Sequence, residues 1–597
     1  MNAVEILART RLFSGLAPDV LERLAARSRE RALAAGDLLF AIGDPAQQLF
    51  VVAMGRLRVT LADGSIANDI DRHEPVGEIA LLAGEPHSAR CQAIRDSRLL
   101  VIEREELMDC LHQHPQAWAE LTRMVIQRLR QNLRGRSAVV RPPAIQALSL
   151  IPGSGQVDLL PLAQALSDAI DRGHSRVIDS ALVDHHLGLG MAQASFGSSP
   201  GEQRLQEWLQ AQERTWKHLV WVGDAEANGW TARCLRHADR VVVVVDAREA
   251  PGATLPAWLE RRSRLAAPLD LLLLHSGERP PPGRVQAWCE ALHPQGHYLL
   301  RPGDRQGLLR LARHLSGRAL GLVLGGGGAR GFAHLGLMRA LEELRLPVDL
   351  VGGSSMGAFL GGLMAQGHDA HSIRHIARES FVDHNYLNDY VLPRVALIRG
   401  RKFLNHLRRV FADGAIEDLA IPYFCVSTNL TQGSAVVHRD GPLHLWVGTS
   451  MAVPGVAPPV AWRGDLLVDG AVVNSLPTDI MQAMGRGPIL ASDVSTEGAL
   501  ALPGVEGPDP EALLRRSRLS DDENQRPGLL SILFRTATLT SESGRAARAA
   551  RADLYLRMPV GGVALFDWQR MDEIIERSYQ KALPLLERWK SEAGLTV

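Results

Sequence analysis

Lysine is the scarcest charged residue in this sequence of 597 residues. It occurs at only four positions, so 62 of the 66 basic residues are arginine, and 66 acidic residues balance their charge. A net charge of zero argues against a nucleic-acid-binding protein, because such proteins typically carry a basic excess. The scarcity of lysine also argues against ATP hydrolysis through a phosphate-binding loop, since a working loop of this kind requires a lysine. The four lysines are Lys217, Lys402, Lys581 and Lys590.

Cysteine is also rare. The five cysteines are odd in number and widely spaced, and none forms a C-x-x-C pair. This pattern excludes a disulfide framework and a cysteine metal site, and it indicates reduced thiols in the cytosol. We therefore predict a cytoplasmic protein. The cysteines are Cys91, Cys110, Cys234, Cys289 and Cys425.

Long uninterrupted apolar runs are missing as well. Charges at Glu5, Arg9 and Arg11 prevent an apolar signal-peptide core at the N-terminus. Two charge-free stretches approach bilayer length, but glycines interrupt 350–366 and prolines interrupt 441–462. We predict no signal peptide and no membrane-spanning helix, and leave open a peripheral membrane contact.

The chain length allows three to five domains at about 100–200 residues each, and the sequence pattern favours three. The first, residues 1–138, has short alternating strands at 49–52, 56–61 and 98–102 with Gly-Asp turns, which predict a small β-barrel or jelly roll. An amphipathic helix closes it, with Trp118, Leu121 and Val125 on its apolar stripe. Arg141-Pro142-Pro143 is typical of a linker.

The middle domain, residues 144–316, alternates strands and helices. Continuous apolar strands such as the five valines at 241–245 indicate a buried parallel sheet, and so a doubly wound α/β domain. From residue 148 to Gly155 the chain loosely resembles P-loop ATPases of the partitioning type. Because the required lysine is missing, we expect a degenerate P-loop fold with a structural or regulatory role. Its predicted strands are 147–151, 219–222, 240–245, 269–274 and 298–300.

The third domain, residues 317–597, contains G-x-S-x-G in the setting that this motif needs. A strand at 348–351 leads into Gly353-Ser354-Ser355-Met356-Gly357, and a helical run follows from residue 358. Such a turn would expose the Ser355 hydroxyl at a helix N-terminus, where developing negative charge is favoured. The alternative is a tight glycine turn without chemistry. A charged, proline-bearing stretch at 503–527 is typical of an insertion, and the apolar run 529–534 would pack in the core or enter a membrane interface.

Upstream, Gly326-x-Gly328-x-x-Gly331 follows a strand at 320–324 and begins a helix. Alone it fits either a dinucleotide-binding loop or an oxyanion hole. The dinucleotide reading requires an acidic residue at the end of the next strand, but that strand leads into the serine turn. An oxyanion hole built from the N–H groups of Gly327 and Gly328 therefore fits better.

The residues alone leave the base that would activate Ser355 undecided. Asp469 lies in an apolar strand before Gly470-Ala471, where burial would raise its pKa, although an aspartate that caps a turn is the alternative. Three histidines share helical spacing, but no cysteine or Glu-x-x-His pattern accompanies them, so we predict no metal site. The candidate histidines of the domain are His334, His368, His371, His375 and His438.

The motifs GGGGARGFAHLG, GSSMG and DGA occur in this order, and with them the third domain resembles the patatin-like phospholipases. The resemblance implies a Ser–Asp dyad without histidine: Ser355 as nucleophile and Asp469 as proton acceptor. It also implies an oxyanion region of Gly326, Gly327, Gly328 and Arg330. Stretches 422–430 and 468–477 resemble the neuropathy target esterase branch in particular.

That resemblance implies a serine lipid acyl hydrolase. It would cleave carboxylic esters of phospholipids or lysophospholipids through an acyl-enzyme, with no cofactor required. The alternative is a non-catalytic scaffold that responds to a nucleotide or binds lipid.

The first domain resembles a cyclic nucleotide-binding domain through VGEIALL at 76–82, the start of a phosphate-binding cassette. The resemblance implies a nucleotide site at Gly77, Glu78, Ser88 and Arg90, with Glu78 on the ribose 2′-hydroxyl. His87 stands where the family has an arginine, and Arg90 lies three residues further on. Histidine lacks the permanent bidentate charge of arginine. A cyclic nucleotide regulator and a ligand-free docking module therefore both stay open.

Overall fold

The computed structural model describes residues 3–64, 66–135, 145–154, 157–195, 199–252, 267–384, 386–496, 508, 511 and 529–592. The chain divides into two compact units: Met1–Leu274 with Ala287–Gly296, and His275–Gln286 with His297–Val597. The predicted linker at 141–143 lies outside the described residues, as does nearly all of the predicted insertion at 503–527.

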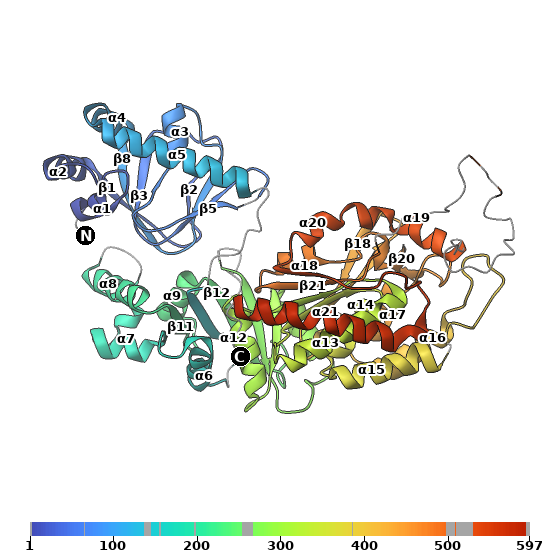
Figure 1. Cartoon of the computed structure of the whole chain (residues 1–597). Helices are drawn as coiled ribbons and strands as arrows, with labels where there is room; N and C mark the ends of the chain where they lie inside the picture. The colour runs from blue at the N-terminus through green and yellow to red at the C-terminus, as the bar shows by residue number, and fades with distance from the viewer. Residues whose placement is uncertain are drawn as a thin grey trace. The chain divides into compact units, whose positions relative to one another are not determined.

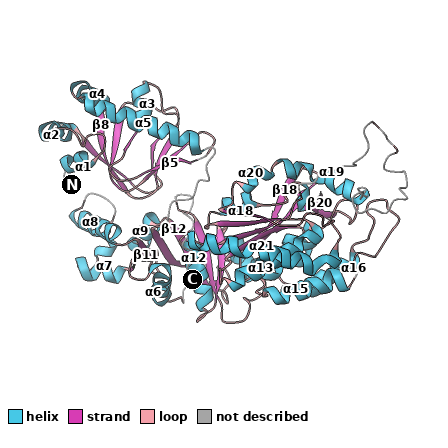
Figure 2. Cartoon of the chain, viewed as in Figure 1, coloured by secondary structure: helices cyan, strands magenta, loops and turns pink. Residues whose placement is uncertain are grey.

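The first unit begins with a jelly roll of two four-stranded antiparallel sheets, as the alternating short strands predict (Figures 1 and 2). One sheet has the order β1-β8-β3-β6 and the other β2-β7-β4-β5. The strands are β1 (Arg29–Leu33), β2 (Leu38–Phe40), β3 (Gln48–Met54), β4 (Leu57–Thr60), β5 (Ile66–Ile70), β6 (Pro75–Val76), β7 (Arg90–Ala93) and β8 (Ser97–Glu103). The helices are α1 (Ala3–Arg9), α2 (Pro18–Arg27), α3 (Glu78–Ala83), α4 (Arg104–Gln113) and α5 (Pro115–Gly135).

The closing helix of the jelly roll is α5, and it buries only part of the predicted apolar stripe. Ala117 and Leu121 are buried, and Val125 packs against the core, but Trp118 is 43% exposed. The reason is geometric, because Trp118 lies about 100° around the helix from Ala117. The prediction that Trp118 faces the core was therefore wrong.

The α/β part that follows confirms the predicted parallel sheet. Its strands pair in the order β10-β11-β9-β12-β13, all in parallel, with the valines of β12 buried. The strands are β9 (Ala147–Pro152), β10 (Ser175–Ile178), β11 (His218–Val222), β12 (Arg240–Asp246) and β13 (Leu269–Leu274). The helices are α6 (Leu159–Asp171), α7 (Ser180–Leu187), η1 (Met191–Gln193), α8 (Pro200–Thr215) and α9 (Gly229–His237). Further along the chain come α11 (Arg284–Leu292), β14 (Gly296–Leu300) and α12 (Arg305–Leu315).

The second unit is built on an eight-stranded mixed sheet (Figure 2). The order is β19-β20-β17-β16-β15-β21-β22, and β18 pairs with β17 beside this path. The neighbours β17, β16, β15, β21 and β22 run parallel to one another. The other three strands, β18, β19 and β20, form antiparallel pairs. The strands are β15 (Gly321–Leu324), β16 (Leu350–Ser354), β17 (Tyr423–Asn429), β18 (Ser434–His438), β19 (Val460–Trp462), β20 (Asp465–Asp469), β21 (Ile489–Asp493) and β22 (Leu554–Arg557).

Helices pack on this sheet and bury its apolar strands. Two of them, α13 and α21, lie side by side (Figure 1), where the Tyr579 hydroxyl donates to Glu343 (2.7 Å) and the Arg339 guanidinium lies 3.8 Å from the Tyr579 ring centroid. The helices are α13 (Ala333–Glu343), α14 (Met356–Ala365), α15 (Ala370–Arg378), α16 (Arg401–Phe411), α17 (Leu443–Ser450), α18 (Thr478–Met484), α19 (Leu529–Ser543), α20 (Arg545–Ala549) and α21 (Met571–Glu592). Short helical turns are η3 (Gly328–Phe332), η4 (Glu379–Asp383), η5 (Ile416–Asp418), η6 (Gly470–Val472) and η8 (Trp568–Arg570).

Across the part of the chain that the structure describes, no helix is both long and apolar enough to cross a bilayer.

Candidate active site

Ser355 lies in a strained turn between β16 and α14. Its φ is +52°, a left-handed conformation that a residue with a side chain rarely adopts. The predicted strand at 348–351 is shifted, since β16 runs from Leu350 through Gly353 to Ser354. The strand therefore leads directly into the turn, and α14 begins at the residue after Ser355.

Glycine is required on both sides of the turn because the backbone passes too close for a side chain. A Cβ on Gly353 would lie 2.4 Å from the Gly357 carbonyl oxygen, and a Cβ on Gly357 would lie 2.1 Å from the Leu324 carbonyl oxygen. The two glycines of G-x-S-x-G thus let β16, the turn and β15 pack together.

A second serine, Ser450, supports the turn from the C-terminal end of α17. Its hydroxyl accepts a hydrogen bond from the Ser355 backbone N–H (2.9 Å) and donates one to the Val426 carbonyl (2.6 Å). Ser450 is fully buried, so both bonds are shielded from water. Sequence reasoning missed Ser450, because no motif distinguishes it from other serines.

Asp469 reaches Ser355 through the register of the sheet. Ser354 at the end of β16 pairs with Val426, and the next residue of β17, Ser427, pairs with Asp469 of β20. The Ser355 hydroxyl donates to Asp469 Oδ2 at 2.7 Å. The structure therefore brings together two residues that lie 114 positions apart in the sequence.

Burial raises the pKa of the Asp469 carboxyl group to about 7. Two hydrogen bonds oppose this effect, one from the Ala471 N–H to Oδ1 (2.8 Å) and one from Ser355. Asp469 is fully buried, whereas Ser355 is 6% exposed. This carboxyl group can consequently exchange a proton near neutral pH.

The glycine-rich loop after β15 lies next to Ser355. A Cβ on Gly326 would come within 3.2 Å of the Ser355 Cβ, and one on Gly328, whose φ is +56°, would lie 2.3 Å from the Leu565 carbonyl oxygen. The Gly326 N–H donates to the Ser475 carbonyl (3.0 Å), so this amide is already occupied. Within the predicted oxyanion region, the amides of Gly327 and Gly328 are therefore the better candidates.

Arg330 holds this loop rather than facing Ser355. Its Nε donates to the Val563 carbonyl (2.9 Å), and its backbone N–H donates to the Gly327 carbonyl (3.2 Å). Burial lowers the pKa of its guanidinium. The side chain does not line the cavity at Ser355.

None of the candidate histidines bonds to Ser355. The buried ring of His334 contacts the Ser492 hydroxyl and the Gly325 carbonyl, both at 2.8 Å, and burial lowers its pKa to about 4. His438 contacts the Ser427 hydroxyl at 2.7 Å, and burial lowers its pKa to about 4 as well. The remaining histidines, His368, His371 and His375, are exposed. Among the described residues, no group of three histidine, cysteine or acidic side chains could hold a metal ion.

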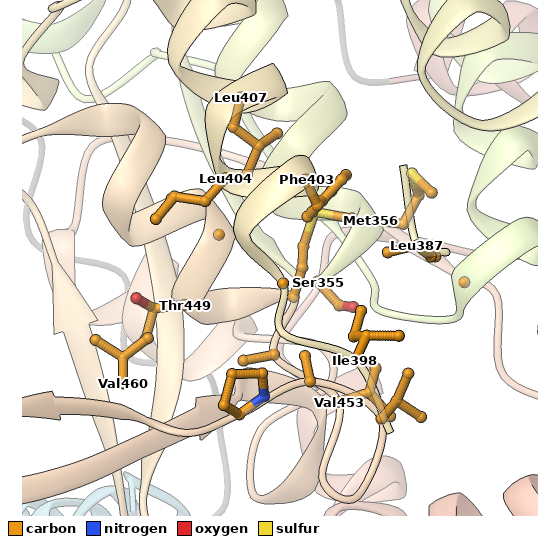
Figure 3. Close-up of a pocket in the computed structure, with 18 of the residues that line it drawn as sticks. Ser355, Met356, Leu387, Ile398, Phe403, Leu404, Leu407, Thr449, Val453 and Val460 are labelled. Carbon is orange, nitrogen blue, oxygen red and sulfur yellow. The ribbon is translucent and has the colours of Figure 1, made fainter. Parts of the chain in front are cut away.

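Ser355 opens into an apolar cavity of about 280 Å³ (Figure 3). Phe534 of α19 contributes to its wall, so part of the predicted apolar run at 529–534 reaches this cavity, while the side chains of 529–531 lie outside the described residues. Arg399 and Arg401 are the charged residues of the lining. Other lining residues include Met356, Leu387, Ile398, Phe403, Leu404, Leu407, Val453 and Val460.

The predicted nucleotide residues lie in the jelly roll, and three of the four share a cavity of about 110 Å³. Gly77, Glu78 and Ser88 line it together with His87. Arg90 does not line it, because its guanidinium bonds to Gln92 (3.2 Å) on the exposed side of β7.

Three family models match the chain. They are described as "Patatin-like phospholipase" at residues 322–481, "Neuropathy Target Esterase family P-loop like domain" at 144–307 and "Cyclic nucleotide-binding domain" at 30–114. Each match falls inside one of the three predicted domains, whose boundaries stay predictions.

The chain is also similar to several curated proteins. "Patatin-like phospholipase domain-containing protein 6" of Pongo abelii is 30% identical over 94% of this chain and 44% of its own length. An uncharacterized NTE family protein of Mycobacterium tuberculosis (strain CDC 1551 / Oshkosh) is 29% identical over 98% of this chain and 97% of its own length. "Lysophospholipase NTE1" of Mycosarcoma maydis is 27% identical over 94% of this chain and 34% of its own length.

This chain thus spans less than half of the Pongo abelii relative and almost all of the mycobacterial one. Along the chain, in this order, lie regions that match a cyclic nucleotide-binding domain, the P-loop-like domain of the Neuropathy Target Esterase family and a patatin-like phospholipase.

Proposed function

We propose that the protein is a serine lipid acyl hydrolase that uses Ser355 and Asp469 as a catalytic dyad. The observation that carries this proposal is the 2.7 Å hydrogen bond from the Ser355 hydroxyl to Asp469, at the wall of an apolar cavity. A nucleophilic serine requires a base within this distance.

The chemistry follows from the charge states. Ionised Asp469 takes the Ser355 proton as the hydroxyl oxygen attacks the acyl carbonyl, and it then gives this proton to the departing alcohol. In the second half, water attacks the acyl-enzyme while Asp469 accepts a proton from it. Asp469 then returns this proton to the Ser355 oxygen as the acyl bond breaks and the fatty acid leaves. The N–H groups of Gly327 and Gly328 are our candidates to stabilise the oxyanion; such donors are each worth about 3–4 kcal/mol.

A long-chain lipid ester is the substrate class that suits this cavity. Its apolar lining offers burial for an acyl chain, at about 0.8 kcal/mol per methylene group. The names of the relatives, a patatin-like phospholipase protein and a lysophospholipase, support phospholipids or lysophospholipids. The proposal needs no metal or cofactor, because the dyad itself supplies the nucleophile and the base.

We infer a peripheral membrane contact through the hairpin at 390–398, which carries part of the cavity wall. Tyr390 and Ile398 form its antiparallel bridge, and Ile398 lines the cavity. At its tip, Leu392 and Val395 are 76% and 70% exposed, with the exposed Arg394 between them. Apolar side chains beside a cation suit insertion among anionic lipid head groups.

The N-terminal domain gives the proposal its regulatory part. We infer that a ligand containing a nucleoside group binds in the cavity at Glu78 and modulates hydrolysis, because this domain matches the cyclic nucleotide-binding model. The cytoplasmic location stays a prediction.

Hydrolysis assays on single variants test the dyad. Ser355→Ala should lower the turnover of lysophosphatidylcholine by at least about a thousandfold, and Asp469→Asn by about a hundredfold or more. Ser354→Ala is the matched control, because the neighbouring Ser354 hydroxyl is buried and has no hydrogen-bond partner among the described residues. Full activity in either dyad variant would refute the mechanism, and an inactive wild type would favour the scaffold alternative.

A further inference from the structure

The cavity of the jelly roll contains a carboxyl group but no permanent cation. Glu78 is 2% exposed and lines the cavity with Asn68 and Ser88, whereas no arginine or lysine is among the described residues of the wall. The apolar residues that line it are Phe40, Val59, Leu61, Ala67, Ile70, Val76, Ile79, Ala80 and Ala89.

His87, at the position where the family has an arginine, is held rigidly in the wall. Its ring stacks on Phe40 with the centroids 3.6 Å apart and the planes at 7°. Its backbone N–H donates to the Asp44 carbonyl (2.9 Å), and its carbonyl accepts from the Gly43 N–H (2.8 Å). Burial lowers the pKa of the imidazole, so the ring is neutral at pH 7.

Two arginines that adjoin lining residues in the sequence, Arg58 beside Val59 and Arg90 beside Ala89, have other partners. Arg90 bonds to Gln92 outside the cavity. Arg58 makes two parallel hydrogen bonds to Asp69, at 2.8 and 2.9 Å, which occupy its guanidinium on the pair of strands β4 and β5. Neither side chain lines the cavity.

This wall disfavours a phosphate. Burying an anion costs several kcal/mol unless a cation or several donors pair with it, and the Glu78 carboxylate would add repulsion. A neutral nucleoside avoids this cost, because its ribose hydroxyls can donate to a carboxylate and its base can contact the apolar wall.

We propose that the jelly-roll cavity binds an uncharged nucleoside, with ribose hydroxyls donating to Glu78, and discriminates against 3′,5′-cyclic nucleotides. The match of residues 30–114 to the cyclic nucleotide-binding model points to a ligand of nucleoside shape. The chemistry of the wall then disfavours a phosphate group on that ligand. This inference does not depend on the esterase activity, because it concerns binding at a separate site.

Calorimetry on the full chain tests the proposal with adenosine, guanosine, cAMP and cGMP. At least one of the two nucleosides should bind at least tenfold more tightly than its own 3′,5′-cyclic monophosphate. Cyclic-nucleotide binding as tight as nucleoside binding would overturn the proposal. Absence of binding by every nucleoside would overturn it too.

Two variants assign the selectivity to named residues. Glu78→Gln should weaken nucleoside binding at least tenfold, and His87→Arg should raise cAMP or cGMP affinity at least tenfold. Arg90→Gln is the control that should change neither affinity. Melting curves verify that each variant is folded, and because the two substitutions act in opposite directions, a general loss of structure cannot mimic both results. Unchanged affinities in folded Glu78→Gln and His87→Arg would overturn the assignment.

Discussion

At the scale of single residues, the main feature of the site is one carboxyl group with an unusual environment. Asp469 is fully buried, and its neighbours are a backbone N–H and the Ser355 hydroxyl rather than a cation. Burial without a cation raises its pKa to about 7, where a typical aspartate would be ionised and weakly basic. A buried aspartate can thus serve as the general base, the role that a histidine has in other serine hydrolases.

The pH dependence of hydrolysis follows from this carboxyl group. Only ionised Asp469 can accept the Ser355 proton, and the ionised fraction rises as the pH passes upward through about 7. We expect kcat/KM for a soluble ester to rise about tenfold per pH unit below pH 7 and to level off above it. A profile that is flat between pH 5 and 7 would show that Asp469 does not titrate in this range.

Ser450 should act as a positioning residue for the nucleophile. Ser450→Ala removes the acceptor of the Ser355 N–H and would let the turn shift, so we expect kcat to fall about tenfold to a hundredfold with little change in KM. Ser578→Ala, another fully buried serine of the same unit, is the control for lost stability alone. An equal effect of both substitutions on kcat would argue against a specific role of Ser450.

At the scale of elements, the site depends on the close packing of β15, β16 and the turn before α14. A Cβ on Gly357 would lie only 2.1 Å from the Leu324 carbonyl oxygen, so the strands and the turn can assume this arrangement only with glycine at this position. The strain at Ser355 is maintained by this packing.

Gly357→Ala should therefore destabilise the protein by about 1–3 kcal/mol and strongly reduce hydrolysis. Gly561→Ala offers a matched control, because a Cβ there would meet no atom within 4 Å and the backbone is not left-handed. Thermal melting and esterase activity of both variants provide the measurement. A Gly357→Ala protein with wild-type activity would contradict the packing argument.

The sequence predicted the elements better than their contacts. Some strands in each domain and the serine turn follow from local patterns, such as the run of valines in β12 and the glycines of G-x-S-x-G. The residues around Asp469 allowed either a base or a turn cap, and in the structure it also accepts the Ala471 N–H as a cap does. The resemblance to patatins separated these readings, since strand register is not visible in one sequence.

Long-range contacts explain what sequence reasoning missed. Ser450 supports Ser355 across 95 positions, and Phe534 reaches the cavity from a helix far along the chain. No periodicity or motif encodes such contacts. Trp118 illustrates the opposite error, because an apolar residue at the margin of a helical stripe was placed in the core.

At the scale of the whole molecule, the proposed function requires a route by which a lipid substrate reaches the cavity at Ser355. The hairpin at 390–398 places its exposed apolar tip and Arg394 on the segment that also forms part of the cavity wall.

Leu392→Asp combined with Val395→Asp should reduce hydrolysis of phosphatidylcholine–phosphatidylserine vesicles about tenfold, and leave hydrolysis of a soluble short-chain ester unchanged. The reason is that two charges replace apolar side chains that would insert among the lipids. Leu189→Asp, at a leucine that is 96% exposed in the first unit, is the control. Equal loss on both substrates would indicate a damaged site instead.

The proposed function depends on Ser355 as a nucleophile that Asp469 activates. Treating the full chain with a fluorophosphonate at pH 8 and locating the adduct by mass spectrometry tests this role. We expect one adduct on Ser355, abolished in Ser355→Ala, slowed about a hundredfold in Asp469→Asn and unchanged in Ser354→Ala. An unmodified Ser355, or labelling at the wild-type rate in Asp469→Asn, would contradict it.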